Sequence, residues 1–227
     1  MEKIIVAIDG NSGCGKSSTA KALAKALKFI YIDTGAMYRA VTLFFIKHKI
    51  DLKNESDVKE ALKQIDISFK YNTTTCNNET YLNGRNVENQ IRKMEVSNLV
   101  STVSTNTQVR SQLVNQQRKL GESKSLVMDG RDIGTVVFPN ADLKIFMTAD
   151  LEVRALRRQK ELKGKNVSID LKDIEENLTN RDRIDSSRKD SPLKKAEGAH
   201  EIDTSNLTFE EQVDQILQLI RHEIEPA

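Results

Sequence analysis

The sequence predicts an α/β protein built on a five-stranded, parallel, doubly wound sheet with helices on both faces. Short apolar runs alternate with helix-like segments along most of the 227 residues, which is the pattern of strand–helix units in a parallel sheet. A glycine-rich loop separates the first apolar run from the first helix. Near the middle the alternation gives way to a hairpin pattern, which predicts a small antiparallel insertion.

The first part of the chain supplies two strands and three helices. Residues 4–8 form a continuous run rich in Ile and Val, which predicts a buried parallel strand. Strong helix formers fill residues 17–29, and the apolar run 29–32 predicts a second strand. A helix is expected from residue 34, because apolar side chains recur there at helical spacing, and a short one over 56–65.

The period of the pattern changes after residue 66. Residues 67–71 alternate between apolar and polar side chains, which is typical of a half-buried strand. Asn83 and Gly84 then lie between two short flanking runs, and this dipeptide is the strongest hairpin signal in the chain. We therefore expect an insertion over residues 66–104.

The remainder returns to strand–helix alternation, so 1–65 and 105–227 together form the predicted core. The expected elements are two helices within 91–120 broken near Asn106, strands at 126–128, 143–147 and 201–202, helices over 151–163 and 170–188, and a final helix that starts with the capping box of Thr208 and Glu211.

The glycine-rich loop after the first strand matches G-x-x-x-x-G-K-[S/T]. Its glycines let the backbone curl so that several N–H groups point at one anion, while Lys16 adds a positive charge and the Ser17 hydroxyl can ligate Mg²⁺. This predicts a P-loop NTPase-type core that holds ATP. The predicted nucleotide-binding residues are Gly10, Asn11, Ser12, Gly13, Cys14, Gly15, Lys16, Ser17 and Ser18.

A second acid is expected beside the metal. Asp129 directly follows the buried run 126–128, at a strand end where an acid commonly supports Mg²⁺. Asp33 ends the second predicted strand and is a competing candidate for the same role. The sequence does not decide which of these two acids supports Mg²⁺.

Composition narrows the class of function. A net charge of +2, 5% aromatic residues and the lack of Trp argue against a nucleic-acid surface. The run at residues 4–8 is too short for a membrane span. Cys14 and Cys76 match no zinc pattern, and Cys14 lies inside the glycine loop, a poor place for a structural disulfide. We therefore expect a reduced, cytoplasmic protein that acts as a monomer on small molecules.

Arginines recur where a second anion would bind. Arg131 lies between two aspartates at a strand end, and Arg181, Asp185 and Arg188 would share one face of the helix over 170–188. Because no N-K-x-D motif of a guanine-nucleotide switch is present, phosphoryl transfer to a small second substrate is favoured. Another small-molecule or nucleotide kinase of this fold, or a nucleotide-binding ATPase, is the alternative.

Several motifs, in order along nearly the whole chain, resemble those of the bacterial cytidylate kinases. They are the phosphate loop, DTGAMYR at 33–39, EVSNLVS at 95–101, VR at 109–110, DGRDIGTVVFPNADLKIF at 129–146 and RDRIDSSR at 181–188. The resemblance implies MgATP-dependent phosphorylation of CMP or dCMP to CDP or dCDP in pyrimidine nucleotide metabolism, with ADP as the other product. It also implies an acceptor-binding insertion and a lid at about 153–168.

The resemblance also assigns roles to residues. The cytosine edge would be recognised by Thr34, Arg110 and Asp132, the sugar by Tyr38, Ser101, Arg181 and Asp185, and the acceptor phosphate by Arg39, Arg131 and Arg188. The catalytic set would be Lys16, Asp129, Arg131, Arg188 and the lid residues Arg157 and Arg158. Arginine can donate to the carbonyl and ring nitrogen of cytosine, and a carboxylate or hydroxyl can accept from its amine.

Overall fold

The computed structural model describes residues 3–73, 77–122, 124–164 and 167–224. The chain forms two compact units, one of Met1–Ile32 with Leu120–Ala227 and one of Asp33–Lys119. The insertion predicted at 66–104 falls within the second unit, and its proposed bounds stay a prediction. Within the described ranges, no helix has both the length and the apolar character needed to cross a bilayer.

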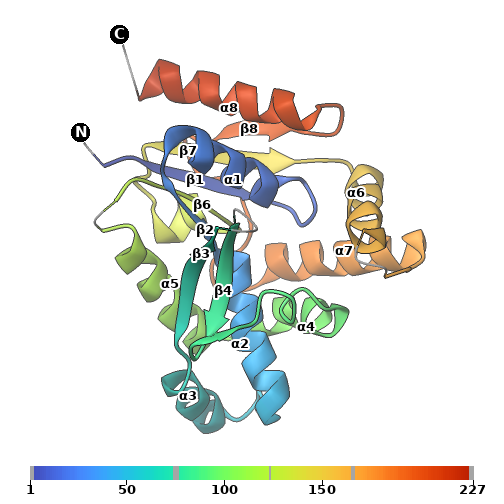
Figure 1. Cartoon of the computed structure of the whole chain (residues 1–227). Coiled ribbons are helices and arrows are strands. Elements are labelled where there is room, and N and C mark those ends of the chain that lie inside the picture. The colour runs from blue at the N-terminus through green and yellow to red at the C-terminus, as the bar shows by residue number, and fades with distance from the viewer. Residues whose placement is uncertain (1–2, 74–76, 123, 165–166, 225–227) are drawn as a thin grey trace. The chain divides into compact units, whose positions relative to one another are not determined.

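The first unit contains a five-stranded parallel sheet with the order β2-β6-β1-β7-β8, which confirms the predicted fold class (Figure 1). Its strands are β1 (Ile5–Gly10), β2 (Ile30–Asp33), β6 (Leu126–Gly130), β7 (Leu143–Thr148) and β8 (His200–Asp203). Its helices are α1 (Lys16–Leu27), η1 (Ile133–Val137), α6 (Leu151–Lys163), α7 (Leu171–Ser187) and α8 (Phe209–Glu223).

Helices cover both faces of this sheet. Ile8 of β1 is fully buried in one cluster with Leu23 of α1 and Ile216 of α8, so these two helices pack on the same face. Side chains alternate along a strand, and the neighbouring Asp9 instead binds the first N–H groups of η1. The π-helix η1 therefore packs on the opposite face. The capping box predicted at Thr208 and Glu211 begins α8.

The described residues of the second unit, 33–73 and 77–119, form helices and a three-stranded antiparallel sheet of order β3-β4-β5. The elements are α2 (Thr34–His48), α3 (Glu55–Lys63), β3 (Ile67–Asn72), β4 (Asn77–Leu82), β5 (Arg85–Asn86), α4 (Met94–Ser104) and α5 (Thr107–Leu120). Asn83 (φ 49°) and Gly84 (φ 76°) both have positive φ, as a two-residue hairpin turn requires. The predicted hairpin and the predicted helix break near Asn106 are both confirmed.

One local prediction needs correction, and one element was not predicted. The helix expected over 170–188 ends at Ser187, and Arg188 is extended (φ −63°, ψ 144°), so Arg188 does not continue the helical face of Arg181 and Asp185. The segment after Arg131 and Asp132 forms the π-helix η1, which local propensity did not predict.

Candidate active site

The phosphate loop connects β1 to α1 and depends on its glycines. Gly10, Gly13 and Gly15 have φ of 147°, 82° and 98°, which side chains rarely adopt. A Cβ on Gly10 would lie 1.9 Å from the main-chain oxygen of Met147 on β7. The loop therefore cannot keep this close approach to the sheet with a larger residue at Gly10.

Lys16 is buried at the start of α1. Its ammonium donates to the carbonyl of Asn11, and its Nζ lies 3.6 Å from the Sγ of Cys14. Burial, and then the positive charge of Arg131, lower the pKa of Lys16 below its ordinary value. A bound phosphate would offset both effects, so this lysine is placed for an anionic ligand.

Two side chains from other elements bind the phosphate loop, and sequence reasoning identified neither of them in that role. Arg154 of α6 donates to the carbonyl of Ser12 (3.1 Å) and to Asp182 of α7 (2.6 Å). The hydroxyl of Thr204, just after β8, donates to the carbonyl of Cys14 (2.9 Å). The sequence marked Arg154 only as part of a basic helix, and no local signal pairs it with Ser12.

The two predicted lid arginines have separate partners. Arg157 donates to the hydroxyl and the carbonyl of Thr204 (3.0 and 2.6 Å), and Arg158 pairs with Glu161 (2.6 Å). The lid predicted at about 153–168 includes residues 165–166, which lie outside the described residues, as does Cys76. The role of both arginines in transfer stays a prediction.

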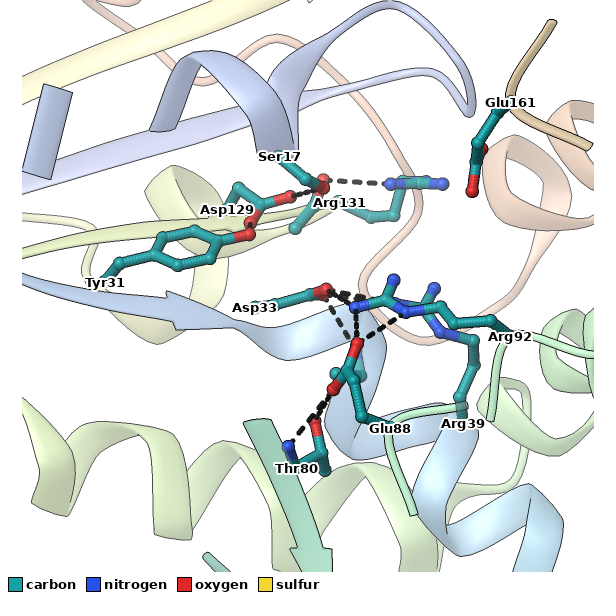
Figure 2. A network of polar contacts seen from close by, with 12 residues as sticks. Ser17, Tyr31, Asp33, Arg39, Thr80, Glu88, Arg92, Asp129, Arg131 and Glu161 are labelled. Atoms are coloured by element: carbon teal, nitrogen blue, oxygen red, sulfur yellow. Dashed lines mark hydrogen bonds and ion pairs between the residues drawn. The ribbon is translucent and has the colours of Figure 1, made fainter. Parts of the chain in front are cut away.

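Asp129 is buried at the carboxyl end of β6, and its carboxylate accepts hydrogen bonds from two hydroxyl groups (Figure 2). Ser17 donates to one carboxylate oxygen (2.8 Å) and Tyr31 to the other (2.9 Å). Oxygen atoms of this kind suit Mg²⁺. Among the described residues, no group of three or more His, Cys, Asp or Glu side chains is arranged to hold a metal.

Asp33, the competing acid, is the last residue of β2 and the first residue of the second unit, and two arginines pair with it (Figure 2). Its carboxylate pairs with Arg39 (3.1 Å) and Arg92 (2.9 Å) and accepts the N–H of Ala36 at the start of α2. Burial disfavours its charge, but Arg39 and then Arg92 outweigh burial and lower the pKa of Asp33 to about 2. These guanidinium groups favour Asp129 over Asp33 as the acid near Mg²⁺.

Arg92 and Glu88 extend this network and were not predicted. Glu88 accepts from Arg92 (2.9 Å) and from the main-chain N–H and the hydroxyl of Thr80 (3.1 and 2.8 Å). The resulting chain of contacts runs from β4 through Glu88 and Arg92 to Asp33 and Arg39 (Figure 2). The spacing of four residues between Glu88 and Arg92 is the only signal that the sequence offered.

Four predicted acceptor-site residues lie together in the first unit. Arg131 donates to Asp185 (2.9 Å), and guanidinium nitrogens of Arg188 lie 3.9 Å from carboxylate oxygens of Asp132 and Asp185. Arg188, Asp132 and Asp185 are buried, and Arg181 lies on α7 one turn before Asp185. The cluster thus gathers positive groups for a phosphate beside carboxylates that can accept from hydroxyl or amine groups.

The other predicted acceptor residues belong to the second unit. The Arg110 guanidinium lies 5.7 Å from the centre of the Tyr38 ring and donates to the carbonyl of Ser104 (3.3 Å). Thr34 is buried at the start of α2, and Ser101 is buried on α4. The structure therefore brings Arg110 and Tyr38 together within this unit.

Comparison with known proteins gives one consistent family. The family model described as cytidylate kinase matches residues 6–222. A cytidylate kinase from Cytophaga hutchinsonii is 58% identical over 96% of this chain and 94% of its own length. Those from Flavobacterium johnsoniae and Parabacteroides distasonis are 53% and 51% identical, covering 97% and 96% of this chain and the same shares of their own lengths.

A solved structure of an uncharacterized protein from Eubacterium ventriosum shares the fold. Its TM-score is 0.51 at 14% sequence identity, over 96% of this chain and 98% of that one. The fold rests on the sheet order and on this likeness, whereas the family rests on the sequence matches over nearly the full length. The chain is an enzyme that belongs to the cytidylate kinase family.

Proposed function

We propose that this enzyme transfers the γ-phosphoryl group of ATP to CMP or dCMP, giving ADP with CDP or dCDP, and that it uses Mg²⁺. The proposal rests on one observation: the first unit contains two separate sets of groups that could bind phosphate. There a phosphate loop with its Ser17–Asp129 contact occurs together with the cluster of Arg131, Asp132, Asp185 and Arg188. Donor and acceptor phosphates would thus each have dedicated groups.

The donor half would work by positioning. The main-chain N–H groups of the loop would surround the β- and γ-phosphates, and Lys16 would neutralise charge that grows on the transferring group. Ser17 and Asp129 would hold Mg²⁺, directly or through water, and Mg²⁺ would supply charge neutralisation on the phosphates. Tyr31 would keep the carboxylate of Asp129 oriented through its hydrogen bond of 2.9 Å.

The acceptor half would orient the attacking oxygen. Arg39, Arg131 and Arg188 would bind the acceptor phosphate, and charge-assisted contacts to three guanidinium groups would fix its direction for in-line attack. No separate general base is needed, because a phosphate monoester oxygen is already ionised at neutral pH. Arg157 and Arg158 would exclude water from the transferring group.

Base selection would depend on matching donors with acceptors. Arg110 can donate to the carbonyl and the ring nitrogen of cytosine, while Asp132 and the Thr34 hydroxyl can accept from its amine. Uracil has a carbonyl in place of that amine and would leave these acceptors facing another acceptor. Tyr38, Ser101, Arg181 and Asp185 would contact the sugar.

The test is release of ADP from MgATP, coupled to NADH oxidation, with CMP, dCMP, UMP, AMP or no acceptor. We expect rapid release with CMP or dCMP and little with the others. Release without an acceptor would instead indicate the ATPase alternative, and rapid release with AMP another nucleotide kinase.

A matched pair of lysine variants locates the chemistry in the phosphate loop. Lys16→Ala should abolish transfer while circular dichroism shows a folded protein, because Lys16 would act on the phosphates. Lys63→Ala is the control, since Lys63 only forms an exposed ion pair with Glu60. Near-normal turnover by Lys16→Ala would refute its assignment. We further propose that the enzyme acts as a cytoplasmic monomer on small molecules. Sedimentation of the purified chain tests whether it is a monomer.

A further inference from the structure

Asp9 is a buried acid that the proposed mechanism does not use. It precedes the first glycine of the phosphate loop, and only 3% of its surface is exposed. Its two carboxylate oxygens accept the main-chain N–H groups of Ile133 (2.8 Å) and Gly134 (2.7 Å), which lie more than 120 residues later in the chain. Asp9 thus joins the strand that carries the phosphate loop to the first turn of η1.

The segment bound by Asp9 directly follows two proposed acceptor-binding residues. Arg131 and Asp132 occupy the short connection between β6 and η1, and Asp132 has an unusual backbone conformation (φ −148°, ψ 26°). The N–H groups in the first turn of a helix have no partner within the helix. Asp9 binds two of them, and therefore fixes the backbone immediately after this bend.

Burying a charged carboxylate costs free energy, so Asp9 is an unfavourable residue for a contact that only maintains the fold. Burial raises the pKa of Asp9 to about 7, against the opposing effect of the N–H groups of Gly134 and Ile133; the nearby Asp132 raises it further and Lys16 lowers it. Yet among side chains only a carboxylate offers two acceptor oxygens and no donor. Buried residues that lower the stability of a fold are expected mainly at sites that function requires.

We propose that Asp9 is a positioning residue for the acceptor nucleotide: by holding the N–H groups of Ile133 and Gly134, it sets the backbone from which Arg131 and Asp132 reach their ligand. This rests on the proposed function, which gives Arg131 and Asp132 their acceptor-binding roles. The side chain of Arg131 is held independently by Asp185, so Asp9 acts on the main chain and Asp185 on the guanidinium.

Asp9→Asn tests the inference with little change in size. The amide retains one acceptor oxygen, but its NH₂ group then faces the second main-chain N–H, and one of the two contacts is lost. In steady-state assays with MgATP and CMP, we expect the KM for CMP to rise about tenfold and kcat to fall about tenfold. The KM for ATP should change by less than about twofold, because the loop glycines and Lys16 are unaltered.

Asp142→Asn is the matched control. Asp142 also accepts a main-chain N–H of β1, that of Ile5 (2.7 Å), but at the opposite end of the strand from the phosphate loop. We expect this variant to lose some stability without any difference between the two KM values. If it showed the same rise in KM for CMP alone, the effect would be a general consequence of weakening β1, and the inference would be wrong.

A second variant keeps the test decisive if Asp9→Asn does not fold. A Cβ on Gly134 would lie 3.4 Å from the Asp9 carboxylate and 3.3 Å from the Cβ of Ala196, so Gly134→Ala places a methyl group beside the same contact, with its tightest approach to Ala196. It should raise the KM for CMP in the same direction but less. Equal changes in both KM values, or none, in the folded variants would overturn the inference. Failure of the wild-type enzyme to use CMP would instead overturn the proposed function.

Discussion

Replacing Arg92 with glutamine should raise the pKa of Asp33 and weaken the second unit. Arg92 is one of two guanidinium groups on this carboxylate, at 2.9 Å, and it also pairs with Glu88 at 2.9 Å. The side chain of Asp33 is only 9% exposed, so water cannot replace the lost contact well. Arg39 and the N–H of Ala36 remain and limit the effect.

The size follows from the pKa of Asp33 in the folded protein. A fall from 3.8 to about 2 corresponds to roughly 2 kcal/mol of net stabilisation, after the opposing cost of burial. A neighbouring opposite charge typically lowers a carboxyl pKa by about one to three pH units. Since Arg39 still pairs with Asp33 in this variant, we expect the pKa to rise by about one pH unit and about 1 kcal/mol to be lost.

The lowered pKa of Asp33 also determines the direction in which stability changes with pH. Because the folded pKa lies below the unfolded one, the pairing stabilises the protein above about pH 4 and loses this effect as the pH falls toward 2. The difference in stability between the wild type and Arg92→Gln should therefore be complete at pH 7 and shrink below pH 4.

Titration of the Asp33 carboxyl carbon by NMR measures the pKa directly, and urea unfolding at pH 7 measures the loss of stability. Lys63→Gln is the control, because it removes an ion pair with Glu60 in which both side chains are about 60% exposed. That change should leave the pKa of Asp33 and the urea midpoint unaltered. An unchanged Asp33 pKa in Arg92→Gln would refute this account of the network.

Three further predictions concern the first unit. Gly10→Ala should destabilise by about 3 kcal/mol or more, because its Cβ would lie 1.9 Å from a main-chain oxygen; a melting temperature equal to that of the wild type would contradict this. Ser17→Ala should raise the Mg²⁺ concentration needed for half-maximal activity about tenfold, since it removes the hydroxyl beside Asp129; an unaltered Mg²⁺ titration would reject that role. Asp9→Asn should also flatten the pH dependence of stability between about pH 4 and 7, where the wild type loses stability as pH rises because the folded pKa of Asp9, about 7, exceeds the unfolded value; parallel urea midpoints over that range would contradict it.

The sequence predicted best those features that depend on neighbouring residues. The hairpin at Asn83 and Gly84, the capping box at Thr208 and the phosphate loop are each encoded within a few residues, and the structure confirms their local geometry. Strand and helix positions followed from the period of apolar side chains, which directly reflects which face is buried. The fold class could therefore be derived without a structure.

Features that depend on distant partners were not predicted. The π-helix η1 has its first N–H groups bound by Asp9, and nothing within residues 131–137 signals that partner. The attachment of the phosphate loop to Arg154 likewise joins residues 142 positions apart. Local propensity contains no information about such contacts, so the sequence yielded the proposed ligand-binding residues but not the residues that hold them.

The charges of the candidate site are largely balanced before any substrate binds. In the first unit Arg131 pairs with Asp185, and in the second Arg39 and Arg92 pair with Asp33. Burying guanidinium groups alone would be costly, and each carboxylate reduces that cost while fixing the direction of its arginine. A phosphate would then be recognised by the geometry of preset arginines rather than by a broad positive field, which agrees with a net charge of only +2. Acceptor binding should consequently depend only weakly on ionic strength, because little long-range attraction is available to be screened.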